Sequence, residues 1–368
     1  MSQRMLVVYC GLLMSLTAFS IDITLPAFPE IAGEFESPYS FVQWTITIFI
    51  FSAGAGQLVW GSVSDRFGRR PILLVGLGLV LIGLMLAAVA PTIGLLLLAR
   101  AVQGFGSASA IVGSRAILRD LFSGKDLARN MAMASAVFAV GPMLAPLFGA
   151  VIADIAGWRA IFFVLACVTL LLIVMLGFFS ETARSKDAKA LQFGRLRSNF
   201  VSLFTNSQSC FFVLVSTLAV AFLLLILTGA APLYESEFGI TGLLFAALFA
   251  LHGLGIIAGQ MLNRHLIQSI GIVPTVVVAS GVMALMSAIF LALTVSNLLI
   301  IIVVPILLAV SNSGFLVFHA NATSLVLDPH EDKAGFAVSV YGFATQMGGA
   351  VIVSVLVLFG DDQALGMS

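Results

Sequence analysis

Two charged residues lie inside long apolar stretches of this sequence, where an ionisable side chain is costly. Asp22 belongs to the first apolar run and Arg100 to a later one. An ionisable residue in hydrocarbon is a functional candidate by default, because it must find a partner or water. A carboxyl group near a guanidinium can take up and release a proton as its surroundings change. The two residues therefore predict a site of proton transfer.

The composition indicates a membrane protein. The chain has 368 residues, of which 60% are hydrophobic and 9% are charged. Soluble domains carry about 25% charged residues, and a soluble protein of this composition would expose large apolar patches. Basic and acidic residues number 17 each, and we expect membrane lipid and no nucleic acid as a partner. Cys10, Cys167 and Cys210 fit no metal-ligand spacing and are expected to be inert.

The apolar runs are long enough to span a membrane as helices, which need about 20 apolar residues each. The sequence predicts an all-α membrane protein with eleven spans, at about 5–28, 40–62, 72–90, 93–114, 128–153, 159–179, 209–232, 241–262, 273–294, 298–319 and 335–359. A twelfth span is either truncated or naturally absent.

The basic residues give the expected orientation. Of 17 Lys and Arg residues, 15 lie on one side of the predicted membrane, while Arg100 lies inside a span and Arg159 on the other side. Positively charged loops stay in the cytoplasm, so we expect that side and the N-terminus to be cytoplasmic.

The two intramembrane charges are expected at matching depth. At 1.5 Å per residue, Asp22 lies about 10 Å and Arg100 about 12 Å below the outer surface. We therefore expect them in one electrostatic network. The alternative is a static buried ion pair that fixes helix packing.

Charge and glycine are concentrated between the second and third spans. This group begins at Gly61, and a weaker copy begins at Gly259, 198 residues later. A similar segment in each half of the sequence indicates a duplicated bundle, as in many secondary transporters. We expect a six-helix bundle over 1–180 and a second bundle with five clear spans over 208–368. The basic, amphipathic linker over 181–207 is either partly a helix on the inner leaflet or a solvated connection.

Several motifs together resemble one transporter family. Residues 61–70 are similar to the first signature of the major facilitator superfamily, and residues 100–104 to its second. Residues 141–149 resemble the signature of drug:proton antiporters. With residues 22–26 and 115–120, the sequence most resembles the bicyclomycin- and chloramphenicol-resistance type of exporter.

The resemblance implies two pseudo-symmetric six-helix bundles, alternating access, and export of lipophilic drugs or antimicrobials from bacteria across the cytoplasmic (inner) membrane. Protons are the implied coupling ion, with Asp22 as the coupling carboxylate and Arg100 in a relay or structural role. We expect a monomer without a cofactor or metal. The sequence departs from the family in its missing twelfth span and in Asn263, which stands where the first copy has Asp65.

The resemblance also implies two conformational devices. A latch is expected to pair across the cytoplasmic seam between the halves; its residues are Gly61, Asp65, Arg66, Gly68, Arg69 and Arg70. The alternative is a simple topogenic loop. Pro142 and Pro146 each lack a backbone donor, and with Gly141 and Gly149 they are expected to kink the fifth span and seal the cavity. Ordinary helix kinking is the alternative.

The substrate cavity is expected to be mostly apolar and aromatic, which tolerates varied ligands. The candidate cavity residues are Trp44, Gln103, Phe138, Asn312, Tyr341 and Gln346. Packing is the alternative for each. His252 and His319 can titrate, although a hydrogen-bonded structural role is the stronger expectation.

Other functions find less support in the sequence. It contains no phosphate-binding Gly-x-x-x-x-Gly-Lys-Ser/Thr loop and no catalytic cluster at usable spacing, so neither ATP hydrolysis nor an enzyme is expected. A facilitator-fold symporter or exporter of a specific metabolite is the first alternative. A non-transporting sensor or scaffold is the second, but it would not need two charges at matched depth.

Overall fold

The computed structural model describes residues 3–183, 187, 190 and 192–360, and all regular structure within them is helical. The elements are α1 (Gln3–Asp22), η1 (Leu25–Ala27), α2 (Phe28–Glu34), α3 (Tyr39–Phe67), α4 (Arg69–Ala88), α5 (Ile93–Leu121), α6 (Gly124–Ala156), α7 (Trp158–Gly177), α8 (Phe193–Thr205), α9 (Ser207–Phe238), α10 (Gly242–Ile270), α11 (Ile272–Val295), α12 (Val303–Leu327), η2 (Asp328–Lys333) and α13 (Ala334–Gly360). The predicted C-terminal bundle extends to 368, and its last eight residues, 361–368, lie outside the described part, as do 184–186, 188–189 and 191 of the linker.

Eleven helical stretches of the described chain are long and apolar enough to cross a membrane, which confirms the predicted number. Their ends differ from the prediction. α5 continues to Leu121, past the predicted end at 114. α12 begins at Val303 instead of 298, because Asn297 adopts a left-handed conformation with φ 53° and the chain turns before the helix starts.

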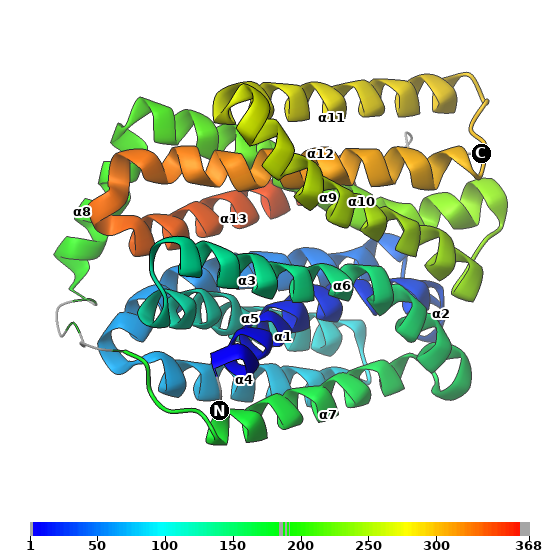
Figure 1. Cartoon of the computed structure of the whole chain (residues 1–368). Coiled ribbons are helices and arrows are strands. Elements are labelled where there is room, and N and C mark those ends of the chain that lie inside the picture. Colours follow the sequence, from blue (N-terminus) through cyan, green and yellow to red (C-terminus); the bar gives the residue numbers. More distant parts are fainter. Residues whose placement is uncertain (1–2, 184–186, 188–189, 191, 361–368) are drawn as a thin grey trace.

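The spanning helices divide into two groups. Figure 1 shows α1 to α7 in the lower group and α9 to α13 in the upper group, with α8 at one end. In the N-terminal group, α5 packs against α3 and α4, and α1 packs against α6. In the C-terminal group, α12 packs against α10 and α11, and α9 against α13. This arrangement is the all-α, two-bundle fold that the sequence predicts.

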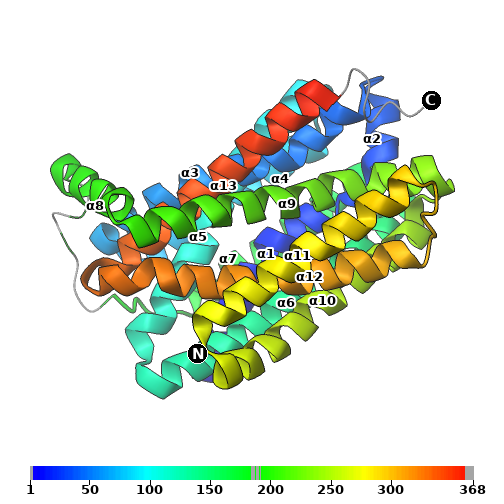
Figure 2. The same ribbon diagram turned by 90° about the horizontal axis from the view of Figure 1, so that it is seen from above.

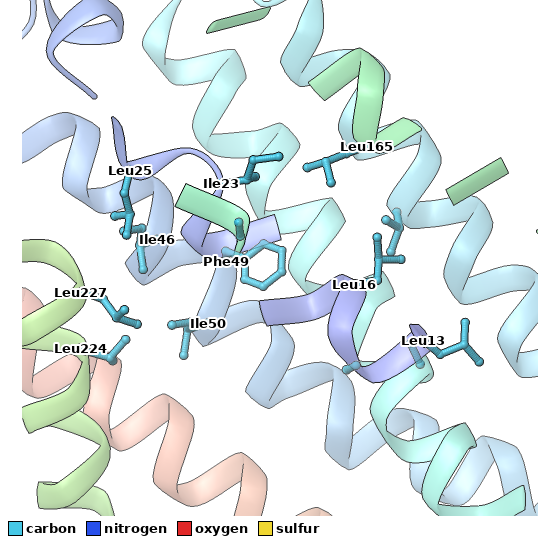
Figure 3. Close-up of a cluster of buried hydrophobic side chains, with 14 of the residues drawn as sticks. Leu13, Leu16, Ile23, Leu25, Ile46, Phe49, Ile50, Leu165, Leu224 and Leu227 are labelled. Carbon is cyan, nitrogen blue, oxygen red and sulfur yellow. The ribbon is translucent and has the colours of Figure 1, made fainter. Parts of the chain in front are cut away.

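The two groups meet along two pairs of long helices. α3 packs against α13, and α6 packs against α10. The turn η1, which follows α1, also contacts α9 and α10. Figure 3 shows Ile50 of α3 pointing toward Leu224 and Leu227 of α9, so apolar side chains continue from one group into the other.

The linker contributes the short helix α8, which Figure 2 shows at the same end of the bundle as the start of α9. α8 packs against α9 and α13. The ring of Phe200 lies 6.5 Å from that of Phe343, and Leu203 is buried in a cluster with Val340 and Tyr341. The apolar face of α8 therefore contacts protein as well as any lipid.

Close approach of α3 and α5 depends on glycines, and Gly104 makes the tightest of these contacts. A Cβ atom at Gly104 would overlap the carbonyl oxygen of Phe49 and lie 3.0 Å from its Cα atom. Backbone atoms in a packed helix cannot move aside as a flexible side chain can, so the position requires a residue without a side chain.

We expect Gly104→Ala to separate α3 from α5 and to lower the apparent melting temperature of the purified protein in detergent by several degrees. Gly78→Ala is the matched control, because a Cβ at Gly78 meets nothing within 4 Å and alanine favours a helix by about 1 kcal/mol. Equal melting temperatures for the two variants would contradict this account of the contact.

Candidate functional site

Asp22 is placed by a proline at the end of the first long helix. Pro26 has no N–H group and cannot donate to the carbonyl of Asp22, so α1 ends at Asp22 and the chain continues as η1. The side chain of Asp22 is only 4% exposed. No ion pair within 4 Å involves Asp22 in the described chain. The structure therefore holds a buried carboxyl group without a cationic partner.

Arg100 bonds to backbone carbonyls of two other helices. Its Nη1 donates to the carbonyl oxygen of Ser20 at 3.0 Å, and its Nε donates to that of Thr45 at 3.3 Å. Nη1 also donates to Oε1 of Gln103 at 2.8 Å, and the guanidinium lies 4.6 Å from the centre of the Phe49 ring. The side chain is 1% exposed. Arg100 thus ties α5 to α1 and α3.

Asp22 and Arg100 lie near each other in the structure but do not form an ion pair. Arg100 binds the carbonyl of Ser20, two residues before Asp22, which supports the predicted matching depth. The alternative of a static ion pair between them is contradicted in this conformation. Nη2 of Arg100 is buried without an acceptor among the described residues. An unpaired buried donor is costly, so a new acceptor that reached this nitrogen would be stabilising.

α6 lies between the two halves beside Asp22. A Cβ at Gly149 would overlap the backbone of Ile23, the residue after Asp22. On its other side, α6 contacts the C-terminal group, where a Cβ at Gly253 of α10 would lie 2.8 Å from Cα of Met143. α6 therefore approaches both the segment after Asp22 and α10 closely, at Gly149 and at Met143.

The two prolines of α6 lie within one continuous helix, Gly124–Ala156. A Cβ at Gly141 would lie 3.7 Å from Ser15, an ordinary van der Waals distance. The Ser15 hydroxyl donates to the carbonyl oxygen of Val137 at 3.1 Å. Pro142 and Pro146 therefore stand in a helix that contacts α1 on one face and α10 on the other.

The charged residues of the predicted latch pair within the N-terminal half. Arg69 donates from Nη1 to Asp65 and from Nε to Asp120, both at 2.9 Å. Gly68 has φ 108°, and a Cβ there would overlap the Glu181 carboxylate. The expectation that these charges pair across the seam is not met in this conformation, because acids of the same half are closer.

The remaining latch residues divide between surface and seam. Arg66 is exposed and lies 5.3 Å from the centre of the Phe67 ring. The side chain of Arg70 reaches the carbonyl oxygen of Gly177 at 3.5 Å. Gly61 does meet the other half, because a Cβ there would lie 2.5 Å from Oγ of Ser339 in α13.

Glu181 organises the start of α4. Its carboxylate accepts hydrogen bonds from the backbone N–H groups of Arg69, Arg70, Thr182 and Ala183. Burial raises the pKa of Glu181, but these four N–H donors outweigh it and hold the pKa below its usual value. The sequence analysis missed this residue; an acid shortly after the end of a span, facing a helix N-terminus, is the signal that could have indicated it.

The predicted cavity residues have different surroundings. Gln103 bonds Arg100 and contacts Gly83 of α4, so it lies inside the N-terminal half and not at the seam. Gln346 contacts Gly54 across the seam, and its Oε1 is buried without a partner. Nδ2 of Asn312 is also buried and unpartnered.

The other candidates are aromatic residues. Trp44 and Phe138 are half-buried. Tyr341 is buried, with its hydroxyl 3.2 Å from Nδ1 of His319. His252 is buried, with Nδ1 2.6 Å from the carbonyl oxygen of Phe249, as expected for a structural histidine.

Comparison with known proteins gives one consistent result. Residues 10–353 match the family model described as Major Facilitator Superfamily. The bicyclomycin resistance protein homolog of Haemophilus influenzae is 30% identical over 365 residues, covering 97% of this chain and 90% of that protein. The multidrug resistance protein MdtL of Escherichia fergusonii is 25% identical, covering 92% and 85%. The crystal structure of a D-xylose-proton symporter superposes with a TM-score of 0.73 at 15% identity, covering 98% of this chain and 90% of that one.

We expect Arg100→Lys to destabilise the protein. A lysine ammonium lacks the planar fork that reaches Ser20, Thr45 and Gln103 together, and a lost buried hydrogen bond costs about 1–3 kcal/mol. Thermal unfolding in detergent should show a lower midpoint than for wild type or for Arg264→Lys, whose parent side chain is exposed. An unchanged midpoint would show that the three acceptors add nothing to stability.

We expect Glu181→Gln to weaken the start of α4, by less than about 1 kcal/mol because the carboxylate is partly solvated. A depressed folded-state pKa adds stability above the unfolded value, which is then lost as the pH falls. The difference in melting temperature between wild type and variant should therefore be present at neutral pH and shrink below the usual glutamate value of 4.5. A difference that grows on acidification would contradict this role.

Proposed function

The chain belongs to the major facilitator superfamily and is a multi-pass membrane transporter rather than an enzyme, and we propose that it exports lipophilic drugs or antimicrobials in exchange for protons. The names of two relatives that match most of the chain, a bicyclomycin resistance protein homolog and a multidrug resistance protein, support this substrate class. We place the protein in the bacterial cytoplasmic membrane, with its N-terminus in the cytoplasm, on the distribution of basic residues.

The proposal depends mainly on the burial of Asp22 without a counter-charge. The carboxyl group is 4% exposed and follows a helix that Arg100 ties to α5. A bare charge is costly in such surroundings. A carboxyl group that is protonated while enclosed and releases its proton when opened to water on the other side would couple proton entry to the cycle. Asp22 is the coupling carboxylate of this proposal, and Arg100 positions the segment that carries it.

The same junction lies where the two halves meet. The turn that follows Asp22, η1, contacts α6 of its own half and α9 and α10 of the other. Movement of one half against the other would therefore change the surroundings of the carboxyl group directly. Such coupling of a buried ionisable group to an interface is what alternating access requires.

The predicted seal, latch and substrate cavity also have roles in the proposed cycle. We propose that α6, held between α1 and α10, seals the pathway near Gly149 against proton leak. We propose that the residues around Asp65 and Arg69 act as the latch in a conformation other than this one, where Arg66 and Arg70 can reach the opposite half. The apolar and aromatic candidates, with the unpartnered amides of Asn312 and Gln346, would bind substrate at the seam.

Asp22→Asn tests the proposal. Purified protein in proteoliposomes should move chloramphenicol, a lipophilic probe antimicrobial, against an imposed proton gradient, and Asp22→Asn should reduce this transport at least tenfold because asparagine cannot carry a proton. Asp154→Asn removes an exposed carboxylate at the outer surface and serves as the matched control. Gradient-driven export by Asp22→Asn at the wild-type rate would refute the coupling role. Probe movement in the same direction as the protons would favour a symporter.

A further inference from the structure

Arg115 lies inside a helix that is long and apolar enough to span the membrane. The predicted span ends at 114, just before Arg115, but the structure places Arg115 inside α5, six residues before the helix ends at Leu121. At 1.5 Å per residue it lies about 9 Å from that end. Ala116, Ile117 and Leu118, all buried, are the signal that α5 continues past Arg115.

Two residues of the other half lie near the Arg115 side chain. It is close enough to His319 of α12 and Tyr341 of α13 for its charge to act on both side chains. His319 is eight residues from the end of α12 at Leu327, and Tyr341 is seven from the start of α13 at Ala334. All three residues therefore lie about 9–12 Å from the cytoplasmic ends of their helices, on both sides of the seam.

The two residues of the C-terminal half form a small polar and aromatic surface. The Tyr341 hydroxyl lies 3.2 Å from Nδ1 of His319. The His319 ring stacks on Phe315, with 5.4 Å between ring centres and 16° between planes. This surface offers hydroxyl and imidazole groups next to an aromatic face.

Arg115 has no acceptor for its charge. It forms no hydrogen bond or ion pair with the part of the chain that the structure describes, where Arg69 pairs with Asp65 and Asp120 and Arg159 pairs with Glu34. Its charged neighbour along α5 is Arg119, which repels it. The Arg115 side chain is half-buried, and a half-buried guanidinium without a counter-charge is costly.

We propose that Arg115, Tyr341 and His319 bind the carboxylate of a lipophilic organic anion as it enters from the cytoplasmic side, which makes such anions a substrate class of the exporter proposed above. A guanidinium fork matches a carboxylate with two parallel hydrogen bonds. The Tyr341 hydroxyl can donate a third bond, and Phe315 with the stacked His319 ring can contact the apolar remainder of the ligand. Because the binding groups come from both halves, the ligand would bridge the seam.

A matched pair of fluorescent probes tests this site in the full chain. Dansylglycine carries a carboxylate, and dansylglycinamide is its neutral counterpart of nearly the same shape. In phosphatidylcholine nanodiscs, with empty nanodiscs as blank, we expect wild type to bind the carboxylate at least tenfold more tightly than the amide. Arg115→Gln should bring the affinities for the two probes to within twofold of each other, and Arg115→Lys should retain part of the preference for the carboxylate. Arg129→Gln, which removes an exposed arginine of the same half, should retain all of it.

Several outcomes would overturn the proposal. One is equal affinity of wild type for the two probes. Another is an unchanged ratio of carboxylate to amide affinity in a folded Arg115→Gln variant. If Arg115→Gln aggregates, Tyr341→Phe replaces it, and it should weaken carboxylate binding severalfold without changing amide binding; an unchanged ratio there would also refute the site. Loss of the carboxylate preference when phosphatidylglycerol is added would assign the site to a lipid headgroup instead of cargo.

Failure of this proposal can be separated from failure of the proton-coupling proposal. Export of the neutral amide by a proton gradient should depend on Asp22 and not on Arg115. Amide export by wild type without any carboxylate preference would refute the anion site alone. A carboxylate preference that persists while Asp22→Asn exports normally would refute the coupling role alone.

Discussion

The cost of an uncompensated charge inside a membrane protein governs the arrangement of this structure. Arg100 avoids most of that cost by bonding to the backbone carbonyls of Ser20 and Thr45 and to the side chain of Gln103. Those bonds tie α1 and α3 to α5 at one depth. The carbonyl of Ser20 belongs to the last turn before Asp22. The same arginine therefore fixes the position of the Asp22 carboxyl group at the end of the first helix.

Two described arginines at the membrane ends, Arg69 and Arg159, are compensated differently. Arg69 lies between Asp65 and Asp120 at one end, and at the other end Arg159 bonds Glu34 and the carbonyl oxygen of Ala90. These pairs form within the N-terminal half and do not need the C-terminal half. They hold the first bundle as a unit, which leaves the α3–α13 and α6–α10 contacts as the surfaces along which the halves can move.

Periodic and compositional signals gave the number of spans and the matching depth of Asp22 and Arg100, because hydropathy and helix rise depend only on the local sequence. They did not give the acceptors of Arg100, since backbone carbonyls carry no sequence signature. They also misplaced the start of α12, because Leu298 to Ile302 are apolar although Asn297 turns the chain there. The predicted span ends at 114, before Arg115, because a basic residue near a span end usually marks the membrane surface.

Asp22 and Arg115, neither of which forms an ion pair within the described chain, have opposite sign but cannot neutralise each other. Arg100 lies near the depth of Asp22, and Arg115 lies fifteen residues further along the same helix, or about 22 Å at 1.5 Å per residue. At that separation the two groups cannot form an ion pair, so each has to be compensated separately. In the proposed cycle a proton does this for the carboxyl group on the proposed outer side, and an organic anion does it for the guanidinium on the proposed cytoplasmic side. Because each can be supplied only when its own side is open, the spacing of these two residues along α5 would itself separate proton uptake from cargo binding in the cycle.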